Sequence, residues 1–133
     1  EPLFETLQLG IKPKEAILKR NISLRTEKMI RQGLEKEVRK LFRKYGSRIP
    51  SLQTIGYQEW LPFLKSRINS PTRKKIGEEI SKLVSGEIQK HTWQYAKRQM
   101  VWFKKDKRII WLPSPHPAPK AVQLVKDFIS RPD

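Results

Sequence analysis

The chain has no cysteine and only two histidines among its 133 residues. Without cysteine it can form neither a disulfide nor a thiolate metal site. His91 and His116 have no acidic neighbours in a ligand-like arrangement, which argues against a histidine metal site. Long apolar runs are missing too, since none approaches the ~18–20 residues of a transmembrane helix. The sequence therefore predicts neither a membrane span nor a metal centre of its own.

Acidic residues are scarce relative to basic ones. Lys and Arg number 29 against 13 Asp and Glu, which gives a formal net charge of +16 and a pI near 10.4. Hydrophobic residues make up 37% of the chain, enough for a lean core in one domain of ordinary length. So large a positive surplus favours a nucleic acid, a phosphate ligand or an anionic membrane as partner. A surface made basic only for solubility is the alternative.

Motifs for self-sufficient catalysis are also lacking. The sequence holds no GxxxxGK[ST] phosphate loop, no serine in a nucleophile elbow and no histidine with a Ser/Asp partner pattern. Residues 1–4 (EPLF) show neither an initiator methionine nor a basic leader. We therefore expect the interior of a longer protein and, by default, a cytoplasmic one.

The first third of the sequence predicts a strand followed by helices. Residues 4–11 alternate and are rich in β-formers, which is typical of a short strand that ends near Gly10. Residues 13–45 follow a helical period, and Asn21 and Ser23 could cap a second helix within this stretch. The apolar stripe of the stretch consists of Ile22, Met29, Ile30, Leu34, Val38 and Leu41.

A short helix is predicted in the middle of the chain. Residues 46–51 have the composition of a loop, and Pro50 ends the preceding pattern. Ser51 or Thr54 can then cap a helix over residues 55–65. Pro62 lies inside that helix and must kink or restart it, because proline removes a helical hydrogen bond.

The longest predicted helix begins at Ser70-Pro71, a serine cap followed by proline in the first turn. It runs to about Lys105, and Gly77 and Gly86 are candidate breaks. Its first apolar stripe is Ile80, Leu83, Val84 and Ile88, and its second is Trp93, Ala96, Met100 and Phe103.

The last third of the sequence predicts a second strand over residues 109–112 (IIWL). Residues 113–119 hold four prolines and form an extended connector, and residues 120–133 form a terminal amphipathic helix. Residues 1–112 are then the part of the chain that precedes this connector. Two strands joined by a helical crossover pair in parallel, and parallel strands are normally covered on both faces inside a larger sheet. The predicted fold class is mainly α with two short parallel strands, a fragment of a larger α/β sheet.

One stretch suited to binding anions or bases is residues 91–105 (HTWQYAKRQMVWFKK). Opposite the apolar stripe of this helix lie Gln94, Lys97, Arg98 and Lys105. These groups can bond to phosphates or base edges. An amphipathic helix with a solvated basic face explains the same periodicity.

Two further stretches have weaker signals. In residues 50–60 (PSLQTIGYQEW), Gly56 allows close approach of a backbone whose free amides attract anions, and Tyr57 adds an aromatic platform. A helix cap with a packing glycine is the alternative. A cluster on the first helix, namely Lys19, Arg20 and Arg25, offers forked and point-charge donors for phosphate oxygens. Any basic helix shows such residues.

Four runs occur in an informative order. They are RTEKMIRQGLEKEVRKL (25–41), PSLQTIGYQEW (50–60), TWQYAKRQMVWFK (92–104) and IIWL (109–112). In order and approximate spacing, over about residues 3–112, they resemble the C-terminal half of tRNA dimethylallyltransferases. The IGY and AKRQ-x-x-WF elements are the most discriminating.

The resemblance implies a reaction and a fold. Dimethylallyl would pass from dimethylallyl diphosphate to the exocyclic amine of the adenosine 3′ of the anticodon, with magnesium and without a covalent enzyme intermediate. The fold would be a P-loop-like parallel sheet with flanking helices, in which the adenosine is flipped into a channel. The phosphate loop, the general base and the magnesium ligands would lie outside this chain. The implied partners are the tRNA anticodon stem-loop and dimethylallyl diphosphate, with no membrane and a monomeric protein.

The resemblance also assigns roles to residues. Arg25 matches a region that helps bind the diphosphate; Asn21 stands where relatives often have arginine, which leaves Arg20 as the second basic contact. The expected tRNA contacts are Gln53, Thr54, Ile55, Gly56, Tyr57, Lys97, Arg98 and Gln99. No catalytic residue and no metal ligand is expected within the chain, so the isolated chain should be inactive. The segment over residues 65–90, between the IGY and AKRQ elements, is longer and more basic than we expect of relatives.

Two other functions stay open at this point. One is a stand-alone basic RNA-binding module without catalysis, which the charge of +16 favours. The other is a basic helical interaction domain with no role in RNA binding.

Overall fold

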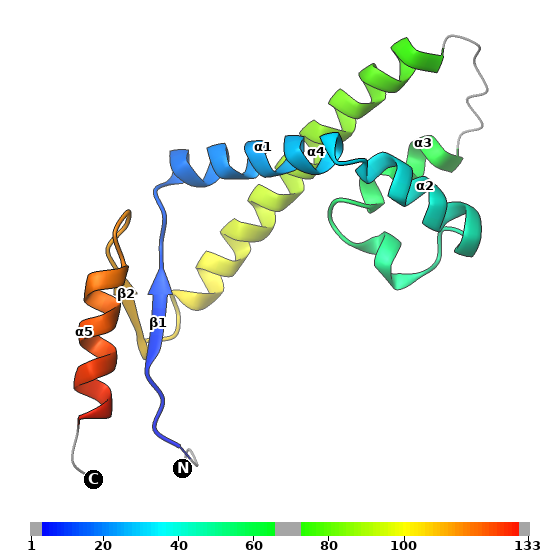
Figure 1. The fold of residues 1–133 in the computed structure, drawn as a ribbon. Helices are drawn as coiled ribbons and strands as arrows, with labels where there is room; N and C mark the ends of the chain where they lie inside the picture. Colours follow the sequence, from blue (N-terminus) through cyan, green and yellow to red (C-terminus); the bar gives the residue numbers. More distant parts are fainter. Residues whose placement is uncertain (1–3, 66–72, 131–133) are drawn as a thin grey trace. The chain divides into compact units, whose positions relative to one another are not determined.

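The computed structural model of the protein describes residues 4–65 and 73–130. In chain order the elements are β1 (Gln8–Ile11), α1 (Glu15–Arg31), α2 (Leu34–Tyr45), the 3₁₀ turns η1 (Pro50–Gln53) and η2 (Gln58–Trp60), α3 (Leu61–Lys65), α4 (Arg73–Phe103), β2 (Ile109–Leu112) and α5 (Ala118–Ile129) (Figure 1). The chain forms two compact units. Unit 1 lies within residues 1–18 and 97–133, and unit 2 comprises residues 19–96.

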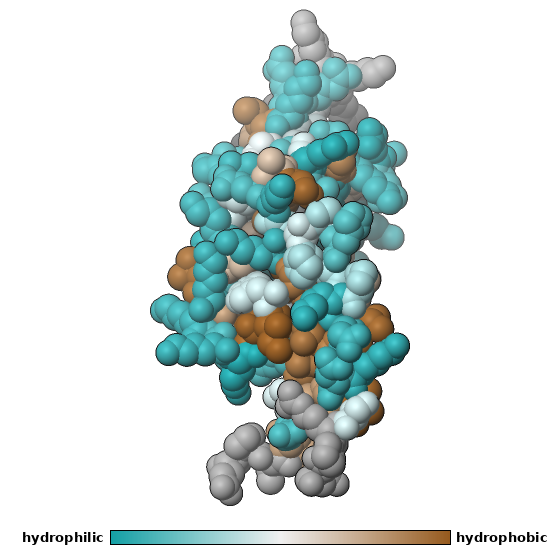
Figure 2. Space-filling view, turned by 90° about the vertical axis from the view of Figure 1, so that its left-hand side faces the viewer, coloured by the Kyte–Doolittle hydropathy of each residue, from teal (hydrophilic) through white to brown (hydrophobic). Residues whose placement is uncertain are grey.

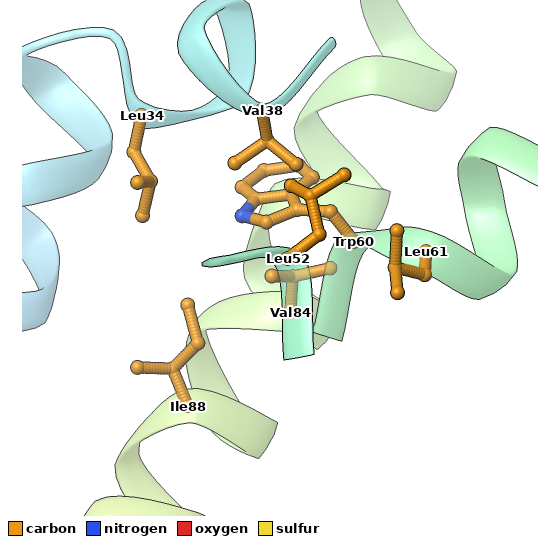
Figure 3. Packing of buried hydrophobic residues seen from close by; sticks show 7 residues of the cluster. All are labelled: Leu34, Val38, Leu52, Trp60, Leu61, Val84 and Ile88. Atoms are coloured by element: carbon orange, nitrogen blue, oxygen red, sulfur yellow. The ribbon is translucent and has the colours of Figure 1, made fainter. Parts of the chain in front are cut away.

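Unit 2 has an apolar core drawn from five elements. Its buried cluster is Leu34, Val38, Leu52, Trp60, Leu61, Val84 and Ile88. Val38, Leu52 and Val84 gather around the indole ring of Trp60, which is only 1% exposed (Figure 3). The helical period places Leu34 and Val38 on one face of α2, so that face packs inward and the basic face is left to solvent.

Helix α1 is unbroken, and the predicted cap at Asn21 or Ser23 is wrong. Ser23 donates its hydroxyl hydrogen to Glu27 Oε1 at 3.1 Å, one turn further along the same helix. The break falls instead at Gly33, whose φ of 98° is the left-handed conformation that glycine adopts without steric cost. Helix α2 begins at the next residue.

The predicted helix over residues 55–65 is wrong in its first half. Gly56 has a φ of 102°, which no right-handed helix contains, so the chain forms η2 and enters α3 only at Leu61. Thr54 does not cap a helix, because its hydroxyl donates to the Ser51 carbonyl oxygen at 2.8 Å. Pro62 restarts the helix, as predicted, since the first turn of α3 tolerates a missing N–H.

Helix α4 runs without interruption through Gly77 and Gly86, so neither glycine is a break. Each glycine costs about 1 kcal/mol relative to alanine in a helix interior. The packing of Val84 and Ile88 in the core outweighs that preference. Leu83 does not belong to the buried stripe, because it is 62% exposed. The predicted start at residues 70–71 lies outside the described residues.

Unit 1 is built on a parallel pair of strands. β1 pairs with β2 from Gln8↔Ile109 to Ile11↔Leu112, which confirms the parallel arrangement, although β1 is shorter than the predicted 4–11. Gly10 is required by close approach, since a Cβ there would lie 2.7 Å from Ile109 Cγ2. The fold class is confirmed: the protein is mainly helical with two parallel strands.

Helix α5 begins at Ala118, two residues before its predicted start, so the proline-rich connector ends at Pro117.

Most of the surface in Figure 2 is hydrophilic, but brown apolar patches interrupt it. Among residues 4–65 and 73–130, no helix is long and apolar enough to cross a membrane.

Candidate nucleic-acid interface

Five of the predicted RNA contacts, residues 53–57, run from the last residue of η1 to the start of η2 in unit 2. We call this segment the 53–57 loop. Its turn depends on the positive φ of Gly56, whose N–H donates to Glu59 Oε2 at 2.8 Å. A Cβ at Gly56 would meet only Met29 Cε, at 3.6 Å, which is ordinary contact. The backbone conformation, and not crowding, therefore requires glycine at this position.

A buried carboxylate fixes the 53–57 loop to helix α4. The Glu59 side chain is 1% exposed, and its second oxygen, Oε1, lies 2.7 Å from His91 Nδ1. Because an ionised carboxylate only accepts hydrogen bonds, Nδ1 is the protonated nitrogen of this pair. His91 Nε2 lies 3.7 Å from Glu87 Oε2 on the same helix. A buried carboxylate needs such partners, and here they hold the glycine turn in place.

Sequence reasoning missed the pairing of Glu59 with His91. The two residues are 32 positions apart, a separation at which no local pattern indicates a contact. The available signal was the spacing of Glu87 and His91, which puts a carboxylate one turn before the histidine on a helix.

The 53–57 loop is also fixed to helix α2. Tyr57 donates its phenol hydrogen to Glu37 Oε1 at 2.7 Å. This hydrogen bond raises the pKa of Tyr57 above 10.0, with smaller contributions from burial and from the negative charge of Glu37. Tyr57 thus stays protonated at neutral pH and its ring is held at one side of the loop.

The remaining loop side chains divide between surface and core. Gln53 and Thr54 are exposed, and each donates to a backbone carbonyl nearby, Gln53 Nε2 to Ser47 at 2.7 Å and Thr54 Oγ1 to Ser51 at 2.8 Å. Ile55 is partly buried against the core cluster. The loop is therefore preorganised by its own hydrogen bonds and offers Gln53 and Thr54 to a ligand.

The two predicted diphosphate contacts lie on helix α1 but do not face the same way. Five positions along an α-helix turn the side chain by about 140°, which separates Arg20 from Arg25. Arg25 borders the buried positions Ile22 and Thr26, and Arg20 lies away from them. Both arginines are exposed, and neither forms an ion pair within the part of the chain that the structure describes. Their neighbour Lys19 lies over the Trp93 ring, 4.8 Å from its centroid.

Lys97, Arg98 and Gln99 are consecutive on helix α4 and all exposed. The predicted site residues thus form three groups. The 53–57 loop and the α1 arginines belong to unit 2, and the three α4 residues belong to unit 1.

Helix α2 carries a further basic surface that the sequence analysis did not single out. Five side chains line an open hollow there, Lys36, Arg39, Lys40, Arg43 and Lys44. The sequence already shows their spacing along one helical face, which lies opposite the apolar stripe that predicted the helix. In the described ranges no three His, Cys, Asp or Glu side chains converge as a metal site would require.

Comparison with known proteins gives consistent matches. The family model described as IPP transferase matches residues 1–106. A tRNA dimethylallyltransferase of Gloeothece citriformis is 36% identical over 131 residues, which cover 97% of this chain and 40% of that protein. The tRNA dimethylallyltransferase of Microcystis aeruginosa is 38% identical over 112 residues, covering 84% of this chain and 32% of that protein.

Solved structures give the same picture. The tRNA delta(2)-isopentenylpyrophosphate transferase of Staphylococcus epidermidis superposes with a TM-score of 0.74 at 27% identity, over 96% of this chain and 39% of that one. The tRNA isopentenylpyrophosphate transferase of Bacillus halodurans, at 24% identity and a TM-score of 0.68, shows the shared fold alone. The chain thus spans 32–40% of the length of these relatives.

Proposed function

The chain belongs to the IPP transferase family, and we propose that it is the part of a tRNA dimethylallyltransferase that contacts the acceptor RNA and some of the prenyl donor's diphosphate. In this reaction, dimethylallyl passes from dimethylallyl diphosphate to the exocyclic amine of the adenosine 3′ of the anticodon. The observation that carries the proposal is the family match over residues 1–106, which spans the 53–57 loop and the cations of α1 and α4.

The 53–57 loop is proposed to receive the acceptor adenosine. Its shape is set before any ligand arrives, by Glu59 behind Gly56 and by Glu37 beside Tyr57. Binding to a preorganised loop avoids the entropy loss of ordering it, and an oriented acceptor reacts faster. The exposed amide of Gln53 and hydroxyl oxygen of Thr54 are suited to polar groups of a nucleotide.

Arg25 is proposed as the main diphosphate contact of this chain. Its guanidinium is a planar fork of donors that matches phosphate oxygens, and it is exposed without an ion-pair partner among the described residues. Arg20 faces a different direction on α1, so it is the weaker candidate. Lys97, Arg98 and Gln99 are proposed to contact the RNA from α4, because they are exposed and two are cationic.

Magnesium is proposed as a cofactor of the whole enzyme, where it would neutralise charge on the departing diphosphate. The described residues contain no cluster suited to hold it. We propose that the magnesium ligands lie outside this chain.

Kinetics of a complete enzyme that carries this segment would test the assignment. Arg25→Ala should worsen the kinetic constant for dimethylallyl diphosphate by about ten- to a hundredfold, the usual effect of losing a charged hydrogen bond. Lys97→Gln with Arg98→Gln should chiefly worsen the kinetic constant for tRNA. Arg31→Ala, at the end of the same helix α1, is the matched control for loss of an arginine. If Arg25→Ala altered only the tRNA constant, the assignment would be reversed.

A stand-alone basic RNA-binding module is the second candidate, favoured by the net charge of +16. In that case the chain would bind an anticodon stem-loop and Arg25→Ala would leave binding of dimethylallyl diphosphate unchanged. Under either candidate the isolated chain is expected not to transfer dimethylallyl.

A further inference from the structure

Five cations form one stripe on helix α2. The α2 basic stripe consists of Lys36, Arg39, Lys40, Arg43 and Lys44, which together line an open hollow. Their spacing confines them to an arc of about 140° around the helix and to about 12 Å along it. All five are exposed, and the stripe lies opposite the buried Leu34 and Val38.

The acidic residues of α2 leave most of this charge uncompensated. Glu35 pairs with Arg39 at 2.8 Å, and Glu37 accepts the Tyr57 hydrogen bond. Lys36, Lys40 and Arg43 form no ion pair with any residue in the described ranges. Like charges three or four positions apart repel and destabilise a helix. Folding alone therefore gives no reason for this density of cations.

We propose that the α2 basic stripe is a binding site for the phosphates of a paired RNA stem, the stem of the acceptor RNA. The site deepens the proposed function and rests on it for the identity of the RNA. Glu37 lies at the edge of the stripe, about 60° from Lys40 around the helix axis, and it bonds to Tyr57 of the 53–57 loop. An RNA whose loop reaches residues 53–57 would thus have its stem within reach of the stripe.

The surroundings of the stripe favour RNA over a membrane. A helix that binds a bilayer surface inserts its apolar face among the lipids. In α2 that face is already used, because Leu34 is 5% exposed and Val38 is fully buried in the core. Lipid headgroups could therefore contact the stripe only through its charges.

The surroundings also favour a paired stem over a single strand. Single strands are held by bases stacking on aromatic side chains, but the five side chains that line the hollow are all Lys or Arg. The aromatic neighbours on the described residues lie at its margins, Tyr57 beside Glu37 and Tyr45 at the end of the helix. Lys44 lies over that ring, 4.9 Å from its centroid. Phosphates on a double-stranded stem need only well-spaced cations, and long Lys and Arg side chains around a hollow supply them.

Salt-dependent binding of the 133-residue chain to a stem-loop RNA tests the proposal. The variant Lys36→Gln/Lys40→Gln/Arg43→Gln removes three charges from the stripe. The control Lys12→Gln/Lys120→Gln/Lys126→Gln removes three exposed charges from unit 1. Circular dichroism should show both variants folded, because glutamine is a good helix former at exposed positions.

For the stripe variant, we expect the negative slope of the logarithm of the RNA association constant against the logarithm of salt concentration to become shallower by about 2 to 3. We also expect its affinity for RNA near 0.1 M salt to fall by more than about tenfold. The control should change both by much less. A second stem-loop with a scrambled stem should show the same loss, since phosphate contacts carry no sequence information.

Three results would overturn the proposal. An equal loss in the control would mean that total charge, and not the stripe, governs binding. An unchanged slope in the stripe variant would place the contacts elsewhere. Tighter binding of the chain to phosphatidylserine vesicles than to RNA, abolished in the stripe variant, would make the partner a membrane. Because transfer is not measured, these results are independent of whether the proposed reaction occurs.

Discussion

Units 1 and 2 differ in how they use their apolar side chains. Unit 2 buries seven of them in one cluster around Trp60. In unit 1 the only apolar side chain of the described residues that is buried is Leu112, at 7% exposure. Its strands and helices expose Ile110, Trp111, Val122, Val125 and Ile129 by 37% or more.

The difference shows where stability resides. Apolar area removed from water is the main favourable term in folding, so unit 2 should hold most of the free energy of unfolding. A two-stranded sheet is marginal without packing on its faces. Unit 1 is thus the region expected to open first, and the proposed loop and stripe lie in the more stable unit.

Truncating one tryptophan in each unit should give the largest contrast. Trp60→Ala removes a ring that is 1% exposed and should lower the free energy of unfolding by about 3–5 kcal/mol. Trp111→Ala removes a ring that is 37% exposed and should cost about 1–2 kcal/mol. Urea unfolding followed by circular dichroism measures both. Equal losses would show that the two units share one stability.

A buried carboxylate and a partly exposed one give the next contrast. Glu59→Ala leaves the Gly56 N–H without its acceptor and should cost about 2–3 kcal/mol. Asp106→Ala in unit 1 breaks an exposed pair with Arg108 and should change little. Glu59→Gln is the control, because the amide oxygen can accept from Gly56 and the amide N–H can donate to His91 Nδ1 when the ring carries its proton on Nε2 instead. A loss in Glu59→Gln as large as in Glu59→Ala would mean that charge, and not the two hydrogen bonds, matters.

Glycine-to-alanine changes should have opposite signs in the two units. Gly10→Ala places a Cβ against Ile109 and Trp111 and should destabilise unit 1 by about 1–3 kcal/mol. Gly86→Ala meets nothing within 4 Å and should stabilise α4 by up to about 1 kcal/mol. Thermal unfolding of both variants checks the signs. A stabilising Gly10→Ala would show that the strands can separate to make room.

The smallest contrast is in pH dependence. The pKa of Tyr57 in unit 2 is raised above 10.0 by its hydrogen bond to Glu37. The stability that this bond contributes is therefore present below pH 10 and is lost at higher pH. The pKa of Asp106 in unit 1 is lowered from 3.8 to about 2 by its hydrogen bonds with Arg108. The stability that this pair contributes is therefore present above pH 3.8 and is lost as pH falls to about 2. NMR titration should show Glu37→Gln lowering the Tyr57 midpoint. An unchanged midpoint would exclude Glu37 as the cause.

Sequence reasoning succeeded where local pattern decides the structure. The strand IIWL, its parallel pairing with β1 and the presence of helices at α4 and α5 follow from period, proline and the need for a crossover. It failed where a single residue or a long-range contact decides. Gly33 ends α1 inside an uninterrupted helical period, while Asn21 and Ser23 have cap-forming side chains that the helix does not use.

The candidate site shows the same division. The 53–57 loop was located by its glycine and tyrosine, yet its predicted helical state was wrong because Gly56 adopts a positive φ. What sets that conformation is Glu59, whose burial depends on contacts with α4 that sequence spacing does not reveal. The α2 basic stripe follows directly from helical spacing and could have been predicted.

The unequal burial of the tryptophans has an optical consequence. Trp60 in unit 2 is almost fully shielded from water, while Trp102 and Trp111 in unit 1 are 69% and 37% exposed. Indole fluorescence shifts to longer wavelength in water, so the native emission spectrum should combine a blue component from Trp60 with red components from unit 1. Soluble quenchers will reach the red components first. A chain with phenylalanine at positions 93, 102 and 111 would leave Trp60 as an intrinsic fluorophore inside the unit that carries the proposed loop and stripe.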